Sequence, residues 1–332
     1  MSAQVPLRKL ERLFDQLQHL NDDQVVGFME SLEPRYQNAL RPFLVQNDAV
    51  LGYFQKAHQV LHPEPIAVSA FDHQPDDTIA HFQIGSLLGR GGMSSVYSAM
   101  DTKDNREVAL KMIDLCSVSN YQDFLNEARI VAKLKHNNIC SIRSWGFTDE
   151  DQGYIEMPLY LGYSLRDRLD VGPISESELV NFLRQVARGL ASAHDLGVVH
   201  GDIKPENLFL ERGGRIIILD FGIARLESRV PSTAFKVLKG TIPYLSPECI
   251  TDPPAHCISD IWSLGVMAYE LATGHRPFSG NTVTDTVESI LGGELPTTPS
   301  SHPSIENLLS GCLVRDPARR IGTASEALNL LQ

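Results

Sequence analysis

The sequence of 332 residues lacks the features that mark membrane and exported proteins. No apolar stretch approaches the roughly 18 residues that a membrane-spanning helix needs. Glu11 and Asp15 lie where a secretion signal would have its apolar core. We therefore expect a protein with no membrane span and no secretion signal.

Cysteine is scarce, and its five positions are scattered: Cys116, Cys140, Cys249, Cys257 and Cys312. An odd number without regular spacing argues against a disulfide framework and predicts a cytoplasmic location. His256 and Cys257 near Cys249 have no second ligand pair at metal spacing. We interpret these thiols as buried or incidental rather than as metal ligands.

The chain also lacks an excess of positive charge, because its formal net charge is -12. Proteins that bind nucleic acid or anionic membranes need a basic surface, so neither is an expected partner. No run of like charge is long enough to indicate a charged tail. The hydrophobic fraction of 42% is sufficient for a sizeable core, in one large domain or two unequal ones.

The pattern along the chain predicts three regions. Residues 1–62 carry apolar residues at helical steps, which predicts a small bundle of short helices. Residues 63–81 are rich in proline and aspartate and are predicted to be a linker. From Phe82 the pattern changes to that of strands.

The third region begins with strands and continues with helices. Four strands are predicted at Ile84–Leu88, Ser95–Met100, Glu107–Met112 and Gly153–Met157. Two helices are predicted, over Tyr121–Leu134 and from the N-cap Ser175 to about Leu196. A hairpin is predicted between residues 207–210 and 216–219 around Gly213 and Gly214. A small strand-rich lobe followed by a larger helical lobe is an α+β fold.

The most informative segment is residues 198–207, which read VVHGDIKPEN, with a DFG triplet that begins at Asp220. Asp202 can orient or deprotonate a hydroxyl, and Lys204 can neutralise charge on a moving phosphoryl group. Asn207 and Asp220 can hold magnesium ions. Asp202 alone could be a helix cap or an ion-pair partner. The four residue types in this order point to phosphoryl transfer from Mg²⁺-bound ATP.

From about Phe82 to its end, the chain resembles the bacterial eukaryotic-like (Hanks-type) Ser/Thr protein kinases. The resemblance implies the bilobal kinase fold, with an antiparallel β lobe at 82–157, a hinge at 158–162 and a helical lobe at 163–332. It implies ATP and Mg²⁺ as cofactors, with Mn²⁺ as an alternative metal, and proteins with Ser/Thr hydroxyls as substrates.

Residues 88–96, LGRGGMSSV, lie between two predicted strands. Glycines let a backbone close over phosphates, although a glycine-rich hairpin turn has the same composition. The resemblance implies that nucleotide contacts come from Leu88, Gly89, Gly91, Gly92, Ser94 and Val96. Ser94 replaces the third glycine that the family has in this loop.

Lys111 is expected in the middle of a strand, where the family's lysine binds the α- and β-phosphates. A lone strand lysine could equally be a solvated edge charge. Glu127 is the helix glutamate that the resemblance pairs with Lys111, and the alternative is an exposed helix charge. Glu107 and Asp123 are less well placed for this pairing.

The resemblance also places the adenine site. Met157 is the gatekeeper, and the hinge that follows offers the C=O of Pro158 and the N–H of Tyr160. Three side chains are expected to enclose the base, or simply to belong to the core: Val96, Ala109 and Phe209.

The resemblance implies an activation segment from Asp220 to Glu248. Gly201 stands where the family has an arginine that binds phosphate on this segment. The chain thus lacks one phosphate sensor, and we expect its activity to depend little on phosphorylation of that segment. Thr241 is expected to contact Asp202 and Lys204, and the lysine and threonine together favour Ser/Thr over Tyr as acceptor.

Two structural supports are implied by the resemblance. Glu248 is expected to form a buried ion pair with Arg320. Asp260 is expected to support the backbone of the catalytic loop, which is residues 198–207. His200 and Phe221 are expected to be packing residues rather than chemical groups.

Two functions are alternatives to an active protein kinase. A pseudokinase that serves as a binding module is supported by three departures from the family pattern, Ser94, Pro158 and Gly201. A small-molecule kinase is disfavoured by residues 240–248, GTIPYLSPE, which resemble the segment that protein Ser/Thr kinases use as a platform for the substrate. The helices of 1–62 would cap the kinase domain, dock a partner or hold the kinase inactive.

Overall fold

The computed structural model describes most of the chain from His73 onward. The described residues are Phe28, Ser31–Leu32, 73–90, 94–114, 128–148, 152–221, 241–251, 255–295, Thr297 and 302–332. The helical bundle predicted for 1–62 therefore lies almost entirely outside the described residues. Gly91, Gly92 and Glu127 lie outside them too.

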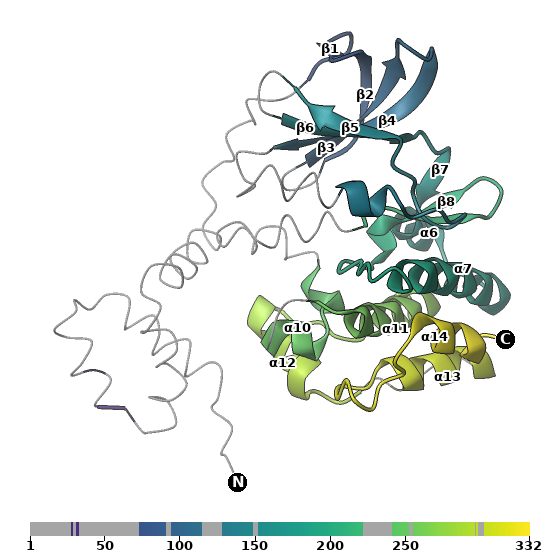
Figure 1. Cartoon of the computed structure of the whole chain (residues 1–332). Coiled ribbons are helices and arrows are strands. Elements are labelled where there is room, and N and C mark those ends of the chain that lie inside the picture. The colour runs from purple at the N-terminus through teal and green to yellow at the C-terminus, as the bar shows by residue number, and fades with distance from the viewer. Residues whose placement is uncertain are drawn as a thin grey trace.

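The first lobe is an antiparallel sheet with the strand order β1-β2-β3-β4-β6-β5, seen at the top of Figure 1. Its strands are β1 Thr78–Ile79, β2 Phe82–Arg90, β3 Ser94–Asp101, β4 Arg106–Asp114, β5 Ser144–Phe147 and β6 Gln152–Pro158. All four strands predicted for this lobe are present, each slightly longer than its apolar pattern. The sequence did not indicate β1, which lies inside the segment predicted as a linker and pairs Ile79 with Phe82 of β2.

Successive side chains of β4 point to opposite faces of the sheet, and this alternation sets the direction of Lys111. In β4, Val108, Leu110 and Met112 are buried on one face of the sheet among the aromatic side chains of the lobe. Ala109 and Lys111 necessarily point to the other face. Lys111 lies opposite Val96 of β3 in the strand register. The sheet therefore places Lys111 beside the end of the glycine-rich β2–β3 hairpin.

The second lobe is mainly helical and lies below the sheet in Figure 1. Its helices are α6 Leu165–Val171, α7 Glu176–His194, η2 Pro205–Asn207, η3 Ile242–Tyr244, α10 Pro247–Thr251, α11 Cys257–Thr273, α12 Val283–Gly292, α13 Pro303–Cys312 and α14 Ala324–Leu330. A three-stranded sheet joins β7 Gly162–Ser164, β8 Leu208–Glu211 and β9 Ile216–Ile218. Fully buried residues of α7 and α11, such as Leu183 and Trp262, form its core. The predicted bilobal α+β fold is thus confirmed.

Helix α7 begins as predicted, because the Ser175 side chain accepts a hydrogen bond from Glu178 N. It ends at His194, two residues before the predicted Leu196. The backbone turns back there: Gly197 has a φ of 70° and Val198 N donates to Ala193 O. This early end delivers the chain directly into the catalytic loop.

The predicted hairpin is also present, with Gly214 in a left-handed conformation (φ 79°). Strand β9 ends two residues before Asp220, and its last residue is bonded to the segment 138–140. Cys140 N donates to Ile218 O, and Ile218 N donates to Asn138 O, both at 2.9 Å. The two lobes are therefore joined by backbone hydrogen bonds next to Asp220. Among the described helices, none has the length and apolar character that a bilayer crossing requires.

Candidate active site

In the catalytic loop, two predicted residues, Lys204 and Asn207, donate to the carboxylate of a third, Asp202. Lys204 Nζ donates to Asp202 Oδ2 at 2.6 Å, and Asn207 Nδ2 donates to the same oxygen at 2.8 Å. The other oxygen, Asp202 Oδ1, is buried and has no hydrogen-bond partner in the part of the chain that the structure describes. A buried, unpaired acceptor is costly unless a ligand uses it. It suits a carboxylate that accepts the proton of a substrate hydroxyl.

Thr241 joins this cluster through Lys204. It is buried at the start of η3, and Lys204 Nζ donates to its Oγ1 at 2.8 Å. Lys204 thus bridges Asp202 and Thr241, although the two are 39 residues apart by number. The predicted contact between Lys204 and Thr241 is present, and Asp202 is linked to Thr241 through the ammonium group.

Asp260 braces the loop backbone, as predicted. Its two carboxylate oxygens accept hydrogen bonds from His200 N and Gly201 N, each at 2.8 Å, an arrangement that suits an anion. Gly201 has a φ of 78°, where a side chain is strained even though a Cβ would meet nothing closer than Ala255 at 3.9 Å. A glycine in place of the family's arginine at position 201 therefore fits the left-handed backbone conformation of the loop. His194 Nε2 bonds to Asp260 at 2.8 Å, a support that the sequence pattern did not indicate.

His200 and Phe221 pack as expected. Both are buried, and their rings meet edge to face with centroids 4.6 Å apart. His200 Nε2 also lies 2.8 Å from Leu219 O. These contacts tie the catalytic loop to the segment that carries Asp220.

Lys111 is not a solvated edge charge. It is 4% exposed, and its Nζ lies 2.9 Å from Asp220 Oδ1. Burial alone would raise the pKa of Asp220, but the Lys111 ammonium lowers it below its usual value. Asp220 is therefore ionised and has a strained φ of 61°, as residues at functional sites often have. The predicted pairing of Lys111 with Glu127 falls outside the described residues.

Asn207 and Asp220 suit a magnesium ion by the chemistry of their donors. Asn207 uses its amide NH₂ on Asp202, which leaves its carbonyl oxygen for a cation. Leu219 N donates to Asn207 O at 2.9 Å, so the two residues are held on adjacent segments. Within the described residues no cluster of three or more His, Cys, Asp or Glu side chains could hold a metal. The carbonyl oxygen of Asn207 and the carboxylate of Asp220 are oxygen donors of the kind that Mg²⁺ accepts, with waters and phosphate oxygens as its other ligands.

The predicted nucleotide residues come from neighbouring strands. Gly89 pairs with Val96 across β2 and β3, and Ala109 pairs with Met157 across β4 and β6. Leu88 and Gly89 are exposed at the mouth, and Ser94 begins β3. Phe209 of β8 lies below, with its ring centroid 6.3 Å from that of Tyr160. The register thus brings these residues to one edge between the lobes.

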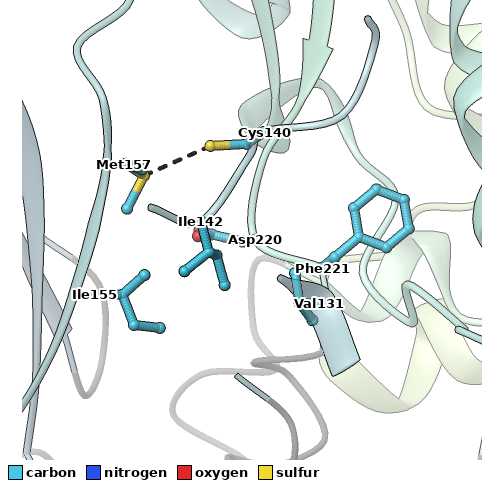
Figure 2. A pocket seen from close by; sticks show the side chains of 7 residues that line it. All are labelled: Val131, Cys140, Ile142, Ile155, Met157, Asp220 and Phe221. Carbon is cyan, nitrogen blue, oxygen red and sulfur yellow. Dashed lines mark hydrogen bonds between the residues drawn. The ribbon is translucent and has the colours of Figure 1, made fainter. Parts of the chain in front are cut away.

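The side chain of Tyr160, in the predicted hinge, is partly buried next to Cys140. Burial and the nearby Cys140 raise the pKa of Tyr160 to about 12. The Cys140 thiol also donates to Met157 Sδ at 3.7 Å, the contact drawn in Figure 2. The Tyr160 side chain is therefore held next to Cys140, and its backbone N–H remains the predicted donor to adenine. Sequence reasoning gave Cys140 no role, since a lone thiol carries no spacing signal.

A small pocket lies between Met157, the predicted gatekeeper, and Asp220 (Figure 2). Its lining is apolar apart from Asp220: Val131, Cys140, Ile142, Ile155, Met157, Asp220 and Phe221. Burial raises the pKa of Cys140 to about 12, so its thiol is protonated at neutral pH. The pocket therefore offers apolar surface next to Met157 and Asp220.

The predicted ion pair below the substrate platform is present. Arg320 donates to both oxygens of Glu248, at 2.6 and 2.9 Å, a bidentate pairing. The guanidinium is fully buried and lies over the Trp262 ring, 5.1 Å from its centroid. The pair fixes the end of the segment that carries Thr241 against α11.

Comparison with known proteins agrees with this geometry. The model of the protein kinase domain matches residues 82–330. The chain is 34% identical to the Ser/Thr-protein kinase PknL of Mycobacterium tuberculosis, over 74% of this chain and 63% of PknL. It is 35% identical to the Ser/Thr-protein kinase PrkC of Bacillus subtilis, over 74% of this chain and 39% of PrkC.

The Ser/Thr-protein kinase PknA of Mycobacterium tuberculosis is 33% identical over 72% of this chain and 58% of PknA. The matches thus span less than two thirds of the length of these curated relatives. The match to the family model covers most of the chain, and it includes every site residue predicted from the sequence. The chain belongs to the protein kinase family, and its predicted resemblance to the bacterial Ser/Thr kinases is confirmed.

Proposed function

We propose that the chain is a Ser/Thr protein kinase that transfers the γ-phosphate of ATP to serine and threonine hydroxyls of proteins. One observation carries this proposal above the others. The buried oxygen Asp202 Oδ1 is unpaired among the described residues, while Lys204 and Asn207 hold the other oxygen. A hydroxyl that donates to Asp202 Oδ1 would lie within reach of the Lys204 ammonium.

The roles of the residues follow from their contacts. Asp202 orients the acceptor hydroxyl and takes its proton, and Lys204 neutralises charge on the transferred group. Lys111 positions the phosphates, and Thr241 shapes the floor below the acceptor. Magnesium held by Asn207 and Asp220 would neutralise phosphate charge when bound. Most of the rate enhancement then comes from positioning and fixed charge.

The metal and the acceptor type are tested together. The chain is incubated with ATP and a generic protein substrate in Mg²⁺, in Mn²⁺ or in EDTA, and the product is hydrolysed in acid. We expect phosphoserine or phosphothreonine with Mg²⁺, some transfer with Mn²⁺ and none in EDTA. Phosphotyrosine as the main product, or transfer that persists in EDTA, would overturn the assignment.

The second candidate function is a pseudokinase that binds a partner through residues 1–62. Its strongest support is the loss of the family arginine at Gly201. That loss removes a phosphate sensor but leaves the contacts of Asp202, Lys204 and Asn207 intact. The active kinase is therefore the better proposal.

We further propose a cytoplasmic signalling role with protein partners and no nucleic acid. The free thiols of the described cysteines and the chain's net charge of -12 support it. The division into 1–62, a linker at 63–81 and a kinase domain at 82–332 remains part of this proposal. Residues 1–62 would cap the domain, dock a partner or inhibit the kinase. Deleting residues 1–77 tests inhibition: a large rise in activity would favour it, and no change would rule it out.

Activity should depend little on phosphorylation of the activation segment. Gly201 offers no guanidinium to bind a phosphate there, and the loop backbone is instead held by Asp260. Replacing Ser228, Ser232 and Thr233 together by alanine should therefore reduce kcat/KM by less than about tenfold, where a full arginine–phosphate contact set would contribute more. A larger loss, with unchanged folding, would contradict the expectation.

A further inference from the structure

Five side chains form a charged network beside the catalytic loop. They come from α6, η2, η3, α11 and the segment after α11: Arg166, Glu206, Tyr244, Glu270 and Arg276. None of the roles given above for the transfer reaction uses this network. Its position and its charge balance indicate what it does.

Arg166 holds three of the elements together. Its Nε donates to Glu206 Oε1 at 2.9 Å, and its Nη2 donates to Tyr244 Oη at 2.8 Å and to Glu270 Oε1 at 2.9 Å. The Tyr244 hydroxyl in turn donates to Glu270 Oε2. Burial and this bond to Glu270 raise the pKa of Tyr244, so its phenol remains protonated.

Arg276 is the second cation of the network. Its Nε donates to Glu270 Oε1 at 3.2 Å, and its Nη2 lies 4.0 Å from Glu206 Oε1. Its guanidinium also lies over the Tyr244 ring, 5.5 Å from the centroid. Each carboxylate of the network therefore faces two guanidinium groups.

The network borders the place of the acceptor on two sides. Glu206 lies in η2 between Lys204 and Asn207, both of which bond to Asp202. Tyr244 ends η3, which begins after Thr241, the partner of Lys204. Glu206 and Tyr244 thus lie within three residues of groups bonded to Asp202 or Lys204, so a protein segment bound at Asp202 would lie near the network.

The network is formally neutral, because two arginines balance two glutamates. Its parts differ in exposure: the Glu270 side chain is 3% exposed, whereas Arg276 is 33% and Glu206 38% exposed. A bare pair of carboxylates here would attract a basic side chain of the substrate. With both arginines in place, a third cation would meet like charge instead.

We propose that this network is a specificity subsite for the acceptor segment of the protein substrate, kept neutral by the chain's own arginines. The inference rests on the proposed kinase function. Arg166 and Arg276 occupy the carboxylates that would otherwise select arginine or lysine in the substrate. The kinase therefore accepts substrates without basic residues around the acceptor.

Removing Arg276 should reverse this selectivity. Its loss leaves two carboxylates and one guanidinium, and it vacates a position that is open to solvent. An arginine from the substrate can then take that position and pair with the carboxylates. The variant Arg276→Ala should gain a preference for basic substrates that the wild type lacks.

The test uses peptides with one serine acceptor and an alanine background. Arginine or aspartate is placed singly at each of three positions on either side of the serine, and kcat/KM is measured. In the wild type, arginine should change kcat/KM by less than about threefold at every position, as for exposed charge pairs. In Arg276→Ala, arginine at one position at least should raise it by about tenfold or more.

Three variants serve as controls. Arg276→Gln repeats the charge loss with a larger side chain, in case the alanine variant folds poorly, and should show the same gain. Arg276→Lys retains the charge and should behave as the wild type. Arg168→Ala removes an arginine from the same region that pairs with Glu178 at 3.0 Å, and should also behave as the wild type.

The outcomes separate this inference from the proposed function. A wild type that prefers arginine tenfold, or a charge-loss variant without the gain, overturns the inference while leaving the kinase function intact. The same gain in Arg168→Ala also overturns it. A wild type that transfers phosphate to no peptide and no protein contradicts the kinase function itself, and the inference with it.

Discussion

Replacing Asp202 by asparagine should lower the rate of phosphate transfer by about 100- to 10,000-fold, the usual contribution of a general base. The substitution keeps the size of the side chain and its packing between Lys204 and Asn207. It removes the charge that aligns the hydroxyl and the buried oxygen that accepts its proton. Steady-state measurement of kcat with a protein substrate gives the loss directly.

The KM for ATP separates catalysis from nucleotide binding in this variant. Asp202 bonds to Lys204 and Asn207, whereas Lys111, the predicted phosphate ligand, pairs with Asp220, so the KM for ATP should change little. Asp195→Asn, on the exposed end of α7, is a matched control and should retain full activity. An Asp202→Asn variant with wild-type kcat would show that the carboxylate does not act in the reaction.

Replacing Arg320 by alanine should lower the free energy of unfolding by about 3–5 kcal/mol, because it leaves Glu248 without its buried partner. Burial alone would raise the pKa of Glu248, but the hydrogen bonds from Arg320 lower it, so the carboxylate is ionised in the folded protein. Arg320 also donates to the Val314 and Ile258 carbonyl groups, at 2.8 and 3.0 Å. Urea denaturation followed by circular dichroism measures the loss.

The exposed pair Arg215–Glu211 provides the control for that measurement. Its arginine is 48% exposed, and Arg215→Ala should cost no more than about 0.5 kcal/mol. Replacing Glu248 and Arg320 together by leucine and methionine should cost less than Arg320→Ala alone, since no charge remains buried. Equal losses for Arg320→Ala and Arg215→Ala would contradict the buried ion pair.

The sequence predicted the catalytic loop well because its chemistry is local. Asp202, Lys204 and Asn207 lie within six residues, and a 3₁₀ turn at η2 is enough to bring their side chains together. Asp220 and Thr241 are distant in sequence, and they were placed by resemblance to the kinase family. The structure shows the contacts that join them, through Lys111 and Lys204.

The elements that sequence reasoning missed are short. β5, β7 and α6 have four, three and seven residues, too few for a clear period of apolar positions. Helix α6 is marked instead by its capping box, Ser164 and Asp167, which was not recognised. Such elements follow from tertiary pairing, as when Gly162 of β7 pairs with Glu211 of β8.

The supports of the site were missed for a different reason. His194, Arg166 and Arg276 act through partners that are 66, 104 and 6 residues away, respectively. From sequence alone, a single charged residue on a helix or in a loop is interpreted as a solvated side chain. Its partner becomes known only from the folded structure. Gly201 could be identified as a departure from the family, but its left-handed φ, which explains the glycine, is visible in the structure alone.

The most direct test of the kinase assignment compares two labels on ATP. The wild-type chain is incubated with Mg²⁺ and a generic protein, using ATP labelled at the γ-phosphate or at the α-phosphate, with Asp202→Asn as the blank. We expect the γ-label, and not the α-label, to appear on protein hydroxyls, and the blank to remain near background. A folded wild-type chain that binds ATP but leaves both labels off the protein would contradict phosphoryl transfer and favour the pseudokinase.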